Sequence, residues 1–348
     1  MASVQTGLVL FFMRKLKGRA VRFMDDIPAL RIEKERMFSR VKCPYRVIID
    51  DFDIGEIEAA KFTPIGAKHK HKVVLYLHGG GYVTGSIKSH AGLIGKLALS
   101  TGIPHVAINY RLAPEHPYPA ALDDAIAAYQ WLQEQGYRAD DILLSGDSAG
   151  GGLVLATLLK IKALKLKQPL AAITLSPWTD LTVTGESATT NPEKDPLLDI
   201  PSARKWGLWY TGGNTKLLKN PFVSPLQGDL EGLAPILMHV GTSEILLSDS
   251  ISFATKAAFT NTTVELEIFE EMPHVFQFCW QYLSEGKQSL QKIADFAEQQ
   301  ILENEKERGF LSANYQSREQ ESTTIAWIER SWEALKMSKK IVKNTLNR

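Results

Sequence analysis

The sequence predicts an α/β protein built on a mainly parallel sheet. Short apolar runs of strand length, such as VVLYL at 73–77 and AAITL at 171–175, alternate along the chain with longer segments of helical pattern. Continuous apolar runs are typical of strands buried on both faces, as in a parallel sheet covered by helices. The alternation of strands and helices predicts right-handed crossovers between neighbouring parallel strands.

The expected elements follow one another in a regular order. The first 40 residues have helical character, with apolar side chains among basic ones. The stretch 176–225 breaks the alternation because it is rich in proline, and we expect it to be an insertion that lies as a lid over the carboxyl ends of the strands. The expected strands span 45–49, 54–62, 73–77, 105–109, 142–144, 171–175, 236–240 and 264–269, and the expected helices after residue 40 span 90–100, 120–135, 152–164, 203–210 and 284–303.

The most informative stretch is GDSAG at 146–150, which lies between an apolar run and a helical segment. A serine on a very tight strand-to-helix turn has a strained backbone, which small neighbours such as Gly146, Ala149 and Gly150 permit. The turn exposes the Ser148 hydroxyl above the sheet, where the N-terminus of the next helix favours negative charge. The pattern predicts a nucleophilic Ser148, although the motif alone leaves open a glycine-rich turn without chemistry.

A second glycine-rich segment, HGGGY at 78–82, directly follows the apolar run 73–77. Consecutive glycines leave backbone N–H groups unshielded, so that several can converge on one oxygen, as an oxyanion hole requires. A flexible loop or a phosphate-binding loop would have a similar composition. A phosphate loop is disfavoured because no Gly-Lys-Ser/Thr follows and Lys88 is distant.

A third block, YRLAPEHPYPAALDD at 110–124, begins as a proline-restricted loop. Together with HGGGY at 78–82 and GDSAGGGL at 146–153, it resembles the GDSAG branch of the hormone-sensitive-lipase-like α/β-hydrolases, over about residues 40–300. The resemblance implies the α/β-hydrolase fold, with a mostly parallel eight-stranded sheet flanked by helices and a helical cap. It also implies hydrolysis of carboxylic esters.

The resulting domain organisation has three parts. Residues 1–40 form an N-terminal cap segment, and residues 41–303 form the catalytic domain, with the cap insertion at about 176–225. Residues 304–348 lie outside the resemblance: 312–323 is a polar linker, and 324–346 has the pattern of an amphipathic helix. This helix could dock on the domain, mediate self-association or contact an anionic membrane.

An activated serine needs a base and an acid that orients the base, in the chain order serine, acid, histidine for this fold. His274 follows the last predicted strand and resembles the histidine of the family's His-Gly-Phe segment, with Val275 in place of glycine. His239 lies inside an apolar strand and is expected to be a core residue. The family pattern places the acid at Glu244, and Asp249 is the competing candidate.

The expected site therefore consists of Ser148, Glu244 and His274. The oxyanion hole is expected from the glycine loop, Gly79, Gly80 and Gly81, with the N–H of Ala149.

Several neighbouring groups are expected to support this site. His78 should anchor the glycine loop, and Asp147 should support it rather than act as a base. Glu115 and Asp123 are expected to brace the same loop. An aromatic lid favours an uncharged apolar substrate; its expected members are Trp178, Trp206, Trp209 and Phe222.

The composition limits the function classes. The net charge of +1 gives no basic field for nucleic acid. Cys43 and Cys279 have no metal-type spacing, and the lysines around His69 and His71 disfavour a cation there, so no metal or cofactor is expected. The apolar run 7–13 is too short to span a bilayer and lacks a preceding basic region, and we expect a cytoplasmic protein. Peripheral membrane contact or self-association through the termini remains open, and the oligomeric state is not predicted.

The sequence thus predicts a serine carboxylesterase for short- to medium-chain acyl esters, acting on a small molecule through an acyl-enzyme. An amidase, deacetylase or lactonase with the same triad is the first alternative. A non-catalytic ligand-binding member of the family is the second, which the presence of Ser148, Glu244 and His274 disfavours.

Overall fold

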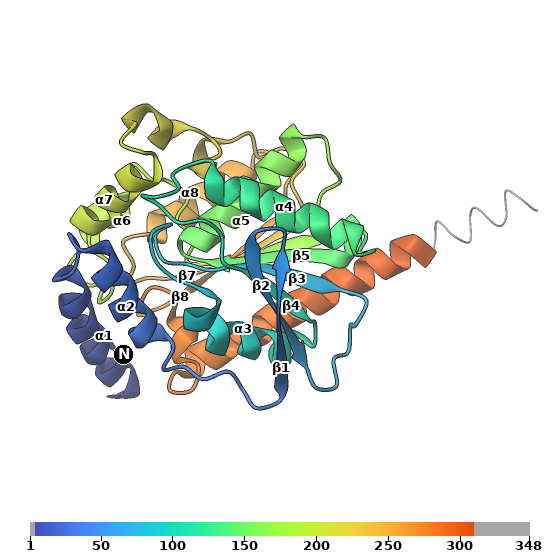
Figure 1. Cartoon of the computed structure of the whole chain (residues 1–348), viewed down its shortest axis with the longest axis horizontal. Helices are drawn as coiled ribbons and strands as arrows, with labels where there is room; N and C mark the ends of the chain where they lie inside the picture. The colour runs from blue at the N-terminus through green and yellow to red at the C-terminus, as the bar shows by residue number, and fades with distance from the viewer. Residues whose placement is uncertain (1–3, 310–348) are drawn as a thin grey trace, which may run out of the picture. The chain divides into compact units, whose positions relative to one another are not determined.

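A single eight-stranded sheet organises the part of the chain that the computed structural model describes, residues 4–309. Its strand order is β1-β2-β4-β3-β5-β6-β7-β8 (Figure 1). The pairs β1–β2 and β2–β4 are antiparallel, and all other neighbouring strands are parallel. This confirms the expected mostly parallel eight-stranded sheet. The strands are β1 Val47–Ile54, β2 Ile57–Pro64, β3 Val73–Leu77, β4 His105–Ile108, β5 Ile142–Asp147, β6 Ala171–Leu175, β7 Ile236–Gly241 and β8 Val264–Phe269.

The middle of the sheet is buried on both faces. Every residue of β3, β4, β5, β6 and β7 is buried, whereas the edge strand β1 is largely exposed. This difference follows from composition, because the central strands are apolar runs and β1 carries three aspartates over Val47–Ile54. The functional segments leave the carboxyl ends of these central strands.

Helices cover both faces of the sheet. Helices α4 (Ala120–Glu134), α5 (Ala149–Ala163) and α8 (Leu247–Ala257) lie on one side, and α3 (Ile87–Thr101) lies on the other (Figure 1). Helix α5 is almost wholly buried, because its own leucine, valine and alanine side chains point outward on all of its sides. Residues 284–298 form a further helix within the same compact unit, residues 1–298. The described residues of the second unit, 299–309, are helical.

Two segments far apart in the sequence lie together at one end of the first unit. Helices α1 (Val4–Val21) and α2 (Ile27–Phe38) come from the N-terminus, and α6 (Glu186–Thr190) and α7 (Ile200–Tyr210) from the expected insertion (Figure 1). The Lys17 ammonium donates to the backbone carbonyls of Asp195 and Leu198, and Lys205 forms an ion pair with Asp25. These contacts join the N-terminal segment to the insertion.

Some boundaries differ from those expected. The first hairpin turns at Gly55, whose φ of +61° suits a glycine, so β1 and β2 begin two and three residues later than predicted. Helix α3 begins at Ile87 because Ser86 and Ser89 form a capping box that the apolar pattern does not reveal. Helices α6 and α8 were not expected, because both are short and rich in serine and threonine.

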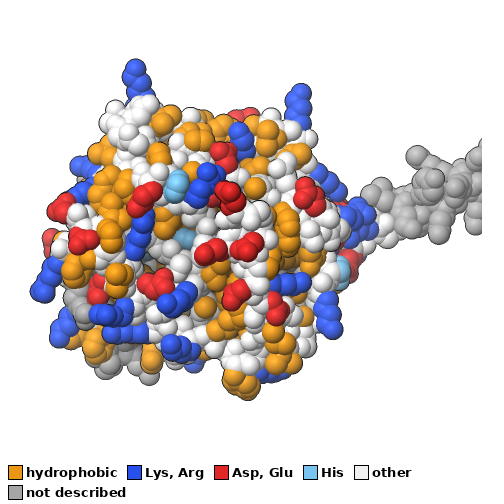
Figure 2. All heavy atoms as spheres, in the orientation of Figure 1, with side chains coloured by type: hydrophobic (Ala, Val, Ile, Leu, Met, Phe, Trp, Pro, Cys, Tyr) orange, Lys and Arg blue, Asp and Glu red, His pale blue; other side chains and the backbone are white. Residues whose placement is uncertain are grey.

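The predicted linker 312–323 and helix 324–346 lie outside the described residues. Within the described range, no helix has both the length and the apolar character needed to cross a bilayer. On the face drawn in Figure 2, acidic and basic side chains are interspersed, in keeping with the near-zero net charge.

Candidate active site

Ser148 lies on the turn between β5 and α5, with backbone angles of φ 54° and ψ −123°. A non-glycine residue in this region is strained and persists only where its surroundings hold it. The glycines on either side are required by close packing. A Cβ atom on Gly150 would lie 2.1 Å from the Leu77 carbonyl oxygen, and one on Gly146 would lie 2.6 Å from the same atom. The turn expected from GDSAG is therefore present.

The structure brings His274 and Glu244 to this serine. The Nε2 atom of His274 lies 2.8 Å from Ser148 Oγ, and its Nδ1 atom lies 2.8 Å from Glu244 Oε2. His274 follows β8 and Glu244 follows β7, so the three side chains come from the carboxyl ends of three different strands. Ser148 is partly exposed, whereas the imidazole and the carboxylate are buried. Substrate can therefore reach the hydroxyl, while water is kept from the groups behind it.

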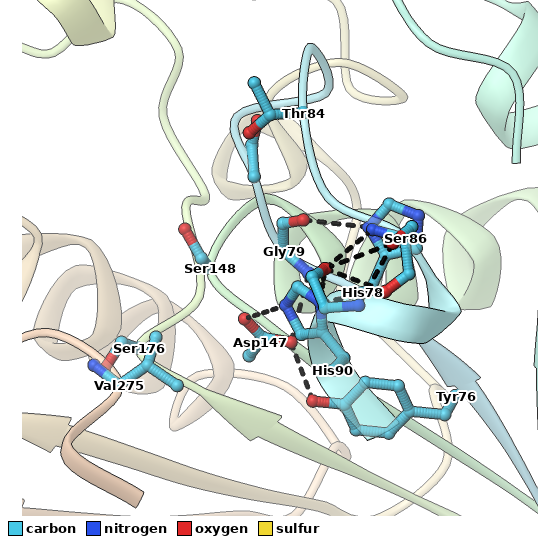
Figure 3. Close-up of polar contacts among 12 residues, drawn as sticks. Tyr76, His78, Gly79, Thr84, Ser86, His90, Asp147, Ser148, Ser176 and Val275 are labelled. Carbon is cyan, nitrogen blue, oxygen red and sulfur yellow. Dashed lines mark hydrogen bonds and ion pairs between the residues drawn. The ribbon is translucent and has the colours of Figure 1, made fainter. Parts of the chain in front are cut away.

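Ser176, which sequence analysis did not identify, holds the carboxylate in place. Glu244 Oε1 accepts hydrogen bonds from the Ser176 hydroxyl at 2.7 Å and from the Gly241 N–H at 2.6 Å. The Ser176 oxygen in turn accepts the N–H of Val275 at 3.1 Å, and Figure 3 shows these two residues side by side. The one available signal was position, because Ser176 directly follows the end of β6, beside the strand that leads to Glu244.

The electrostatics of His274 suit proton transfer. Burial lowers the pKa of the imidazole, but the hydrogen bond and the negative charge of Glu244 outweigh this effect and raise it above its ordinary value. The same carboxylate accepts the Nδ1–H, which leaves the lone pair of Nε2 directed at Ser148. His274 can therefore take a proton from the serine.

The competing acid, Asp249, has a different role. Its Oδ2 atom accepts the backbone N–H groups of Thr179 and Asp180 at 2.7 and 2.8 Å, so it supports the turn after β6. Burial raises the pKa of this carboxyl to about 7. His239 is fully buried, and its Nδ1 atom lies 2.7 Å from the Ser289 hydroxyl oxygen. No hydrogen bond within the described residues joins Asp249 or His239 to His274.

Gly80 and Gly81 face the serine from the loop after β3. Both have positive φ angles, +124° and +66°. A Cβ atom on Gly80 would lie 2.1 Å from the Thr84 carbonyl oxygen, and one on Gly81 would lie 2.2 Å from the Trp206 ring. Within the described chain, no hydrogen bond occupies the N–H of Gly80, Gly81 or Ala149. These three donors are available to an oxyanion.

Gly79 must be removed from the expected set of donors. Its N–H donates to Asp147 Oδ1 at 3.0 Å, and the Tyr76 hydroxyl donates to the same oxygen at 2.7 Å (Figure 3). Burial raises the pKa of Asp147, but the neighbouring His90 and the Tyr76 hydroxyl lower it below its usual value. Asp147 thus anchors the glycine loop from below, and the Gly79 N–H is not free to bind substrate.

His78 also fixes this loop. Its Nδ1–H donates to the Gly79 carbonyl oxygen at 2.8 Å (Figure 3). Its ring stacks on Tyr110 at 4.2 Å between centroids. Burial, followed by the charge of His90, lowers the pKa of His78 to about 3, so the ring is neutral near pH 7. The Tyr110 hydroxyl donates to the His78 carbonyl oxygen at 2.6 Å.

The expected bracing by the 110–124 block is correct for one acid and wrong for the other. Glu115 forms a 2.6 Å ion pair with Arg31 of α2, whose Nε–H donates to the Val83 carbonyl oxygen in the glycine loop. Asp123 is exposed. The neighbouring Asp124 instead binds the guanidinium and backbone N–H of Arg111.

Two cavities meet at the catalytic groups. A catalytic pocket of about 50 Å³ is bounded by Gly80, Gly81, Ser148, His274, Trp206 and Lys34, among others. A large cavity of about 980 Å³ lies beside it, between α1, α2 and the segment after His274. The shared walls of the two spaces are Phe38, Leu197, His274, Val275 and Phe278.

The expected aromatic lid is only partly in place. Trp206 of α7 lines the catalytic pocket, whereas Trp178 is buried in the core, with its indole N–H donating to the Asp180 carbonyl oxygen. Trp209 and Phe222 pack against the core and do not line this pocket. Lys34 lines it and was not anticipated.

The described residues contain no group of three histidine, cysteine, aspartate or glutamate side chains arranged to hold a metal ion. His69, in the histidine- and lysine-rich loop, instead lies 2.7 Å from Glu298 Oε2.

Comparisons with known proteins agree with this architecture. A family model described as the alpha/beta hydrolase fold matches residues 74–278. The chain is 38% identical over 247 residues to an acetyl-hydrolase of Streptomyces hygroscopicus, covering 71% of this chain and 81% of that protein. It is 39% identical over 226 residues to an esterase of Acinetobacter venetianus, covering 65% and 74% of the two chains.

Among solved structures, an esterase from the bacterial hormone-sensitive lipase family matches with a TM-score of 0.82 and 36% identity, over 86% of this chain and 99% of that one. An esterase whose crystal was soaked with p-nitrophenyl butyrate matches with a TM-score of 0.79 and 34% identity, over 86% and 100% of the two chains. By motif, sheet order and similarity to these proteins, the chain belongs to the α/β-hydrolase fold family, in its hormone-sensitive-lipase-like group.

Proposed function

We propose that this protein is a serine carboxylesterase that hydrolyses short- to medium-chain acyl esters, with Ser148 as nucleophile, His274 as general base and acid, and Glu244 as the group that orients His274. The observation that carries the proposal is the unbroken pair of 2.8 Å contacts from Ser148 through His274 to Glu244. It lies beside backbone N–H groups that no residue of the described chain engages.

In the first half of the reaction, His274 Nε2 removes the Ser148 proton while Oγ attacks the ester carbonyl. Negative charge then develops on the carbonyl oxygen. The N–H groups of Gly80, Gly81 and Ala149 are placed to receive it, and the loss of one such donor typically costs about 10²–10³-fold in kcat. The intermediate collapses when the imidazolium gives its proton to the departing alcohol, which leaves an acyl group on Ser148.

In the second half, a water molecule replaces the alcohol. His274 takes a proton from this water as it attacks the acyl carbonyl, and then returns the proton to Ser148 as the acid is released. Glu244 accepts the Nδ1–H and stabilises the imidazolium in both halves. Ser176 and the Gly241 N–H keep the carboxylate pointed at His274, because they occupy its other oxygen.

The small size of the catalytic pocket supports the proposal that the acyl groups are short. Its volume of about 50 Å³ leaves little room next to Ser148, since Trp206 and Leu198 come close from the cap insertion. A relative that is 38% identical is named an acetyl-hydrolase. The cytoplasmic location expected from the sequence remains a prediction.

The test is hydrolysis of p-nitrophenyl acetate, butyrate, octanoate and palmitate by the wild type and by Ser148→Ala. We expect turnover of the shorter esters and a loss of at least 10³-fold in the variant, the magnitude typical of nucleophile removal. Ser145→Ala is a matched control, because Ser145 is a buried serine of β5, three residues before Ser148.

Two results would reject the proposal. Ester turnover that persists in Ser148→Ala would place the chemistry elsewhere. Absence of ester turnover, with Ser148-dependent release of p-nitroaniline from its acetyl amide, would assign the site to amides.

A further inference from the structure

Lys34 is a buried ammonium in the wall of the catalytic pocket that the mechanism does not use. It lies on the inner face of α2 and is 8% exposed, and it shares the pocket with Ser148, His274 and Trp206. A surface lysine can carry its charge without a partner because water solvates it. A buried one pays a desolvation penalty unless another group compensates the charge.

No acidic side chain of the described chain forms an ion pair with Lys34. Its Nζ atom lies 5.5 Å from the centre of the Trp206 ring and 5.9 Å from that of Phe38. It makes no hydrogen bond or ion pair with another residue of the described chain. Asp199 of α7 is the acid whose charge acts on it, but that carboxylate caps its own helix through the N–H and hydroxyl of Ser202.

The charged side chains that line the large cavity next to the catalytic pocket are positive, like Lys34. Its charged lining consists of Lys15, Arg40 and Lys287, with His274 at the boundary, and no acidic side chain of the described chain contributes to it. The rest of its wall is mainly apolar, with residues such as Phe12, Met37 and Phe278. A molecule entering the site from this side therefore meets apolar surface and positive charge.

We infer that Lys34 is the anion-binding group of the substrate site, and that the preferred substrates are esters carrying a carboxylate close to the reacting carbonyl. A bound carboxylate would supply the counter-ion that the fold lacks, in a low-dielectric pocket where such a pair is strong. This replaces the uncharged substrate expected from an aromatic lid, and it rests on the proposed esterase function.

The carboxylate can be on either side of the ester bond, so the test has two arms. In the first, p-nitrophenyl hemiglutarate is compared with p-nitrophenyl pentanoate, which places the charge on the acyl side. In the second, 4-carboxyphenyl acetate is compared with its methyl ester, which places the charge on the alcohol side. Uncatalysed rates are subtracted, and each ester is measured with the wild type, Lys34→Met and Lys205→Met.

Methionine keeps the apolar stem of Lys34 and removes the charge. We expect Lys34→Met to lower the ratio of kcat/KM for the charged ester to that for its neutral partner at least tenfold in one arm, mainly through the KM of the charged ester. Lys205→Met is a matched control, because Lys205 lies 5.0 Å from the Trp209 ring of α7 but outside the catalytic pocket. Lys205→Met should leave the charged-to-neutral ratio of kcat/KM unchanged in both arms.

A second readout needs only the wild type. Burial lowers the pKa of Lys34 to about 8, against the charge of Asp199. The KM of the preferred charged ester should therefore rise above about pH 8 relative to that of its neutral partner, as Lys34 loses its proton. His274 and Asp147 also line the pocket, but their ionisation acts on both esters, so the ratio isolates Lys34.

The inference is overturned if the wild type prefers neither charged ester and Lys34→Met alters all four esters alike, which would make Lys34 a packing residue. If no ester shows Ser148-dependent turnover, the proposed function fails first. These two failures are distinct, because neutral esters report the function and the charged-to-neutral ratio reports Lys34.

Discussion

At the scale of single residues, His274 depends on opposing influences. Burial favours its neutral form, and Glu244 favours its charged form through a hydrogen bond and its negative charge. A base must be neutral before it accepts a proton, so activity should rise with pH through the pKa of His274. Because that pKa is raised, the rise should be centred above the ordinary value of 6.5.

Replacing Glu244 by glutamine should lower the pH at which activity reaches half of its maximum. Burial is then opposed only by the negative charges of Asp195 and Asp147, so the midpoint of kcat/KM against pH should fall below that of the wild type, and kcat should fall by about 10⁴-fold because the imidazole loses its orientation. The measurement is the pH profile of p-nitrophenyl butyrate hydrolysis. Asp249→Asn is the control and should keep the wild-type midpoint. If Asp249→Asn rather than Glu244→Gln shifts the midpoint, Asp249 is the orienting acid.

Val275 has an unusual backbone conformation for its side chain. Its φ is 47°, in the left-handed region, where a β-branched residue is an outlier and costs about 1–3 kcal/mol. Val275 is one of the residues that line both the catalytic pocket and the large cavity. The position that the family resemblance fills with glycine thus carries a side chain where the two spaces meet.

Val275→Gly should therefore lengthen the accepted acyl chain without destabilising the fold. We expect the kcat/KM ratio of p-nitrophenyl octanoate to butyrate to rise about tenfold or more, since each buried methylene contributes roughly 0.8 kcal/mol. The backbone N–H that reaches Ser176 is retained. Leu198→Ala is the control, because Leu198 lines the catalytic pocket and not the large cavity. An equal rise in both variants would mean that the volume of the catalytic pocket, and not the Val275 side chain, limits chain length.

At the scale of elements, one buried ion pair aligns the starts of two central strands. Lys72 directly precedes β3, and its ammonium lies 2.7 Å from Asp141 Oδ1 and 3.1 Å from the Asp140 carbonyl oxygen, just before β5. The side chain of Lys72 is fully buried. The aligned strands, which pair from Val73 opposite Ile142, lead to the glycine loop and to Ser148.

Lys72→Ala should lower the free energy of unfolding by about 3–5 kcal/mol, because it leaves the Asp141 carboxylate in the interior without this cation. Urea denaturation followed by fluorescence measures the change. Lys167→Ala is the matched control: Lys167 lies 3.2 Å from Asp140 Oδ2 but is 63% exposed, so its loss should cost about 0–1 kcal/mol. Equal costs for the two variants would show that the buried pair does not stabilise this strand alignment.

Sequence alone predicted the elements whose signal is local. The strands at 73–77, 171–175 and 264–269 agree with the structure to the residue, because their apolar or alternating runs end abruptly in polar or turn residues. The prediction that Asp123 braces the glycine loop is wrong, because Asp123 is exposed and the buried acid of this turn is its neighbour Asp124, which binds Arg111. Adjacent helical residues point about 100° apart, and the rotation of a helix against its sheet is not encoded locally.

Some residues of the site could be predicted from the sequence, and others could not. Ser148, His274 and Glu244 could be proposed because each follows a strand within a recognisable motif. Ser176, Trp206 and Lys34 could not, since each is ordinary in its own segment and gains its role from residues far away in sequence. Gly79 fails as an oxyanion donor for a similar reason, because its partner, Asp147, is 68 residues away.

At the scale of the whole catalytic unit, the substrate site is closed by segments from opposite parts of the chain. Arg31 of α2 links the N-terminal segment to the glycine loop and to Glu115, and Lys17 of α1 links it to the cap insertion. The walls of the large cavity come from α1, α2 and the segment after His274. We therefore expect acyl length and charge preference to be set outside the sheet, while the sheet positions the proposed reacting groups.

This arrangement bears on how the protein is made. Helix α1 is synthesised before the cap insertion, and the carbonyl of Leu198 that receives Lys17 lies 181 residues later in the chain. At a synthesis rate of roughly 5–20 residues per second, Lys17 waits about ten to forty seconds for the carbonyl that it binds. This contact between the N-terminal segment and the cap insertion can therefore form only after the central strands have been made.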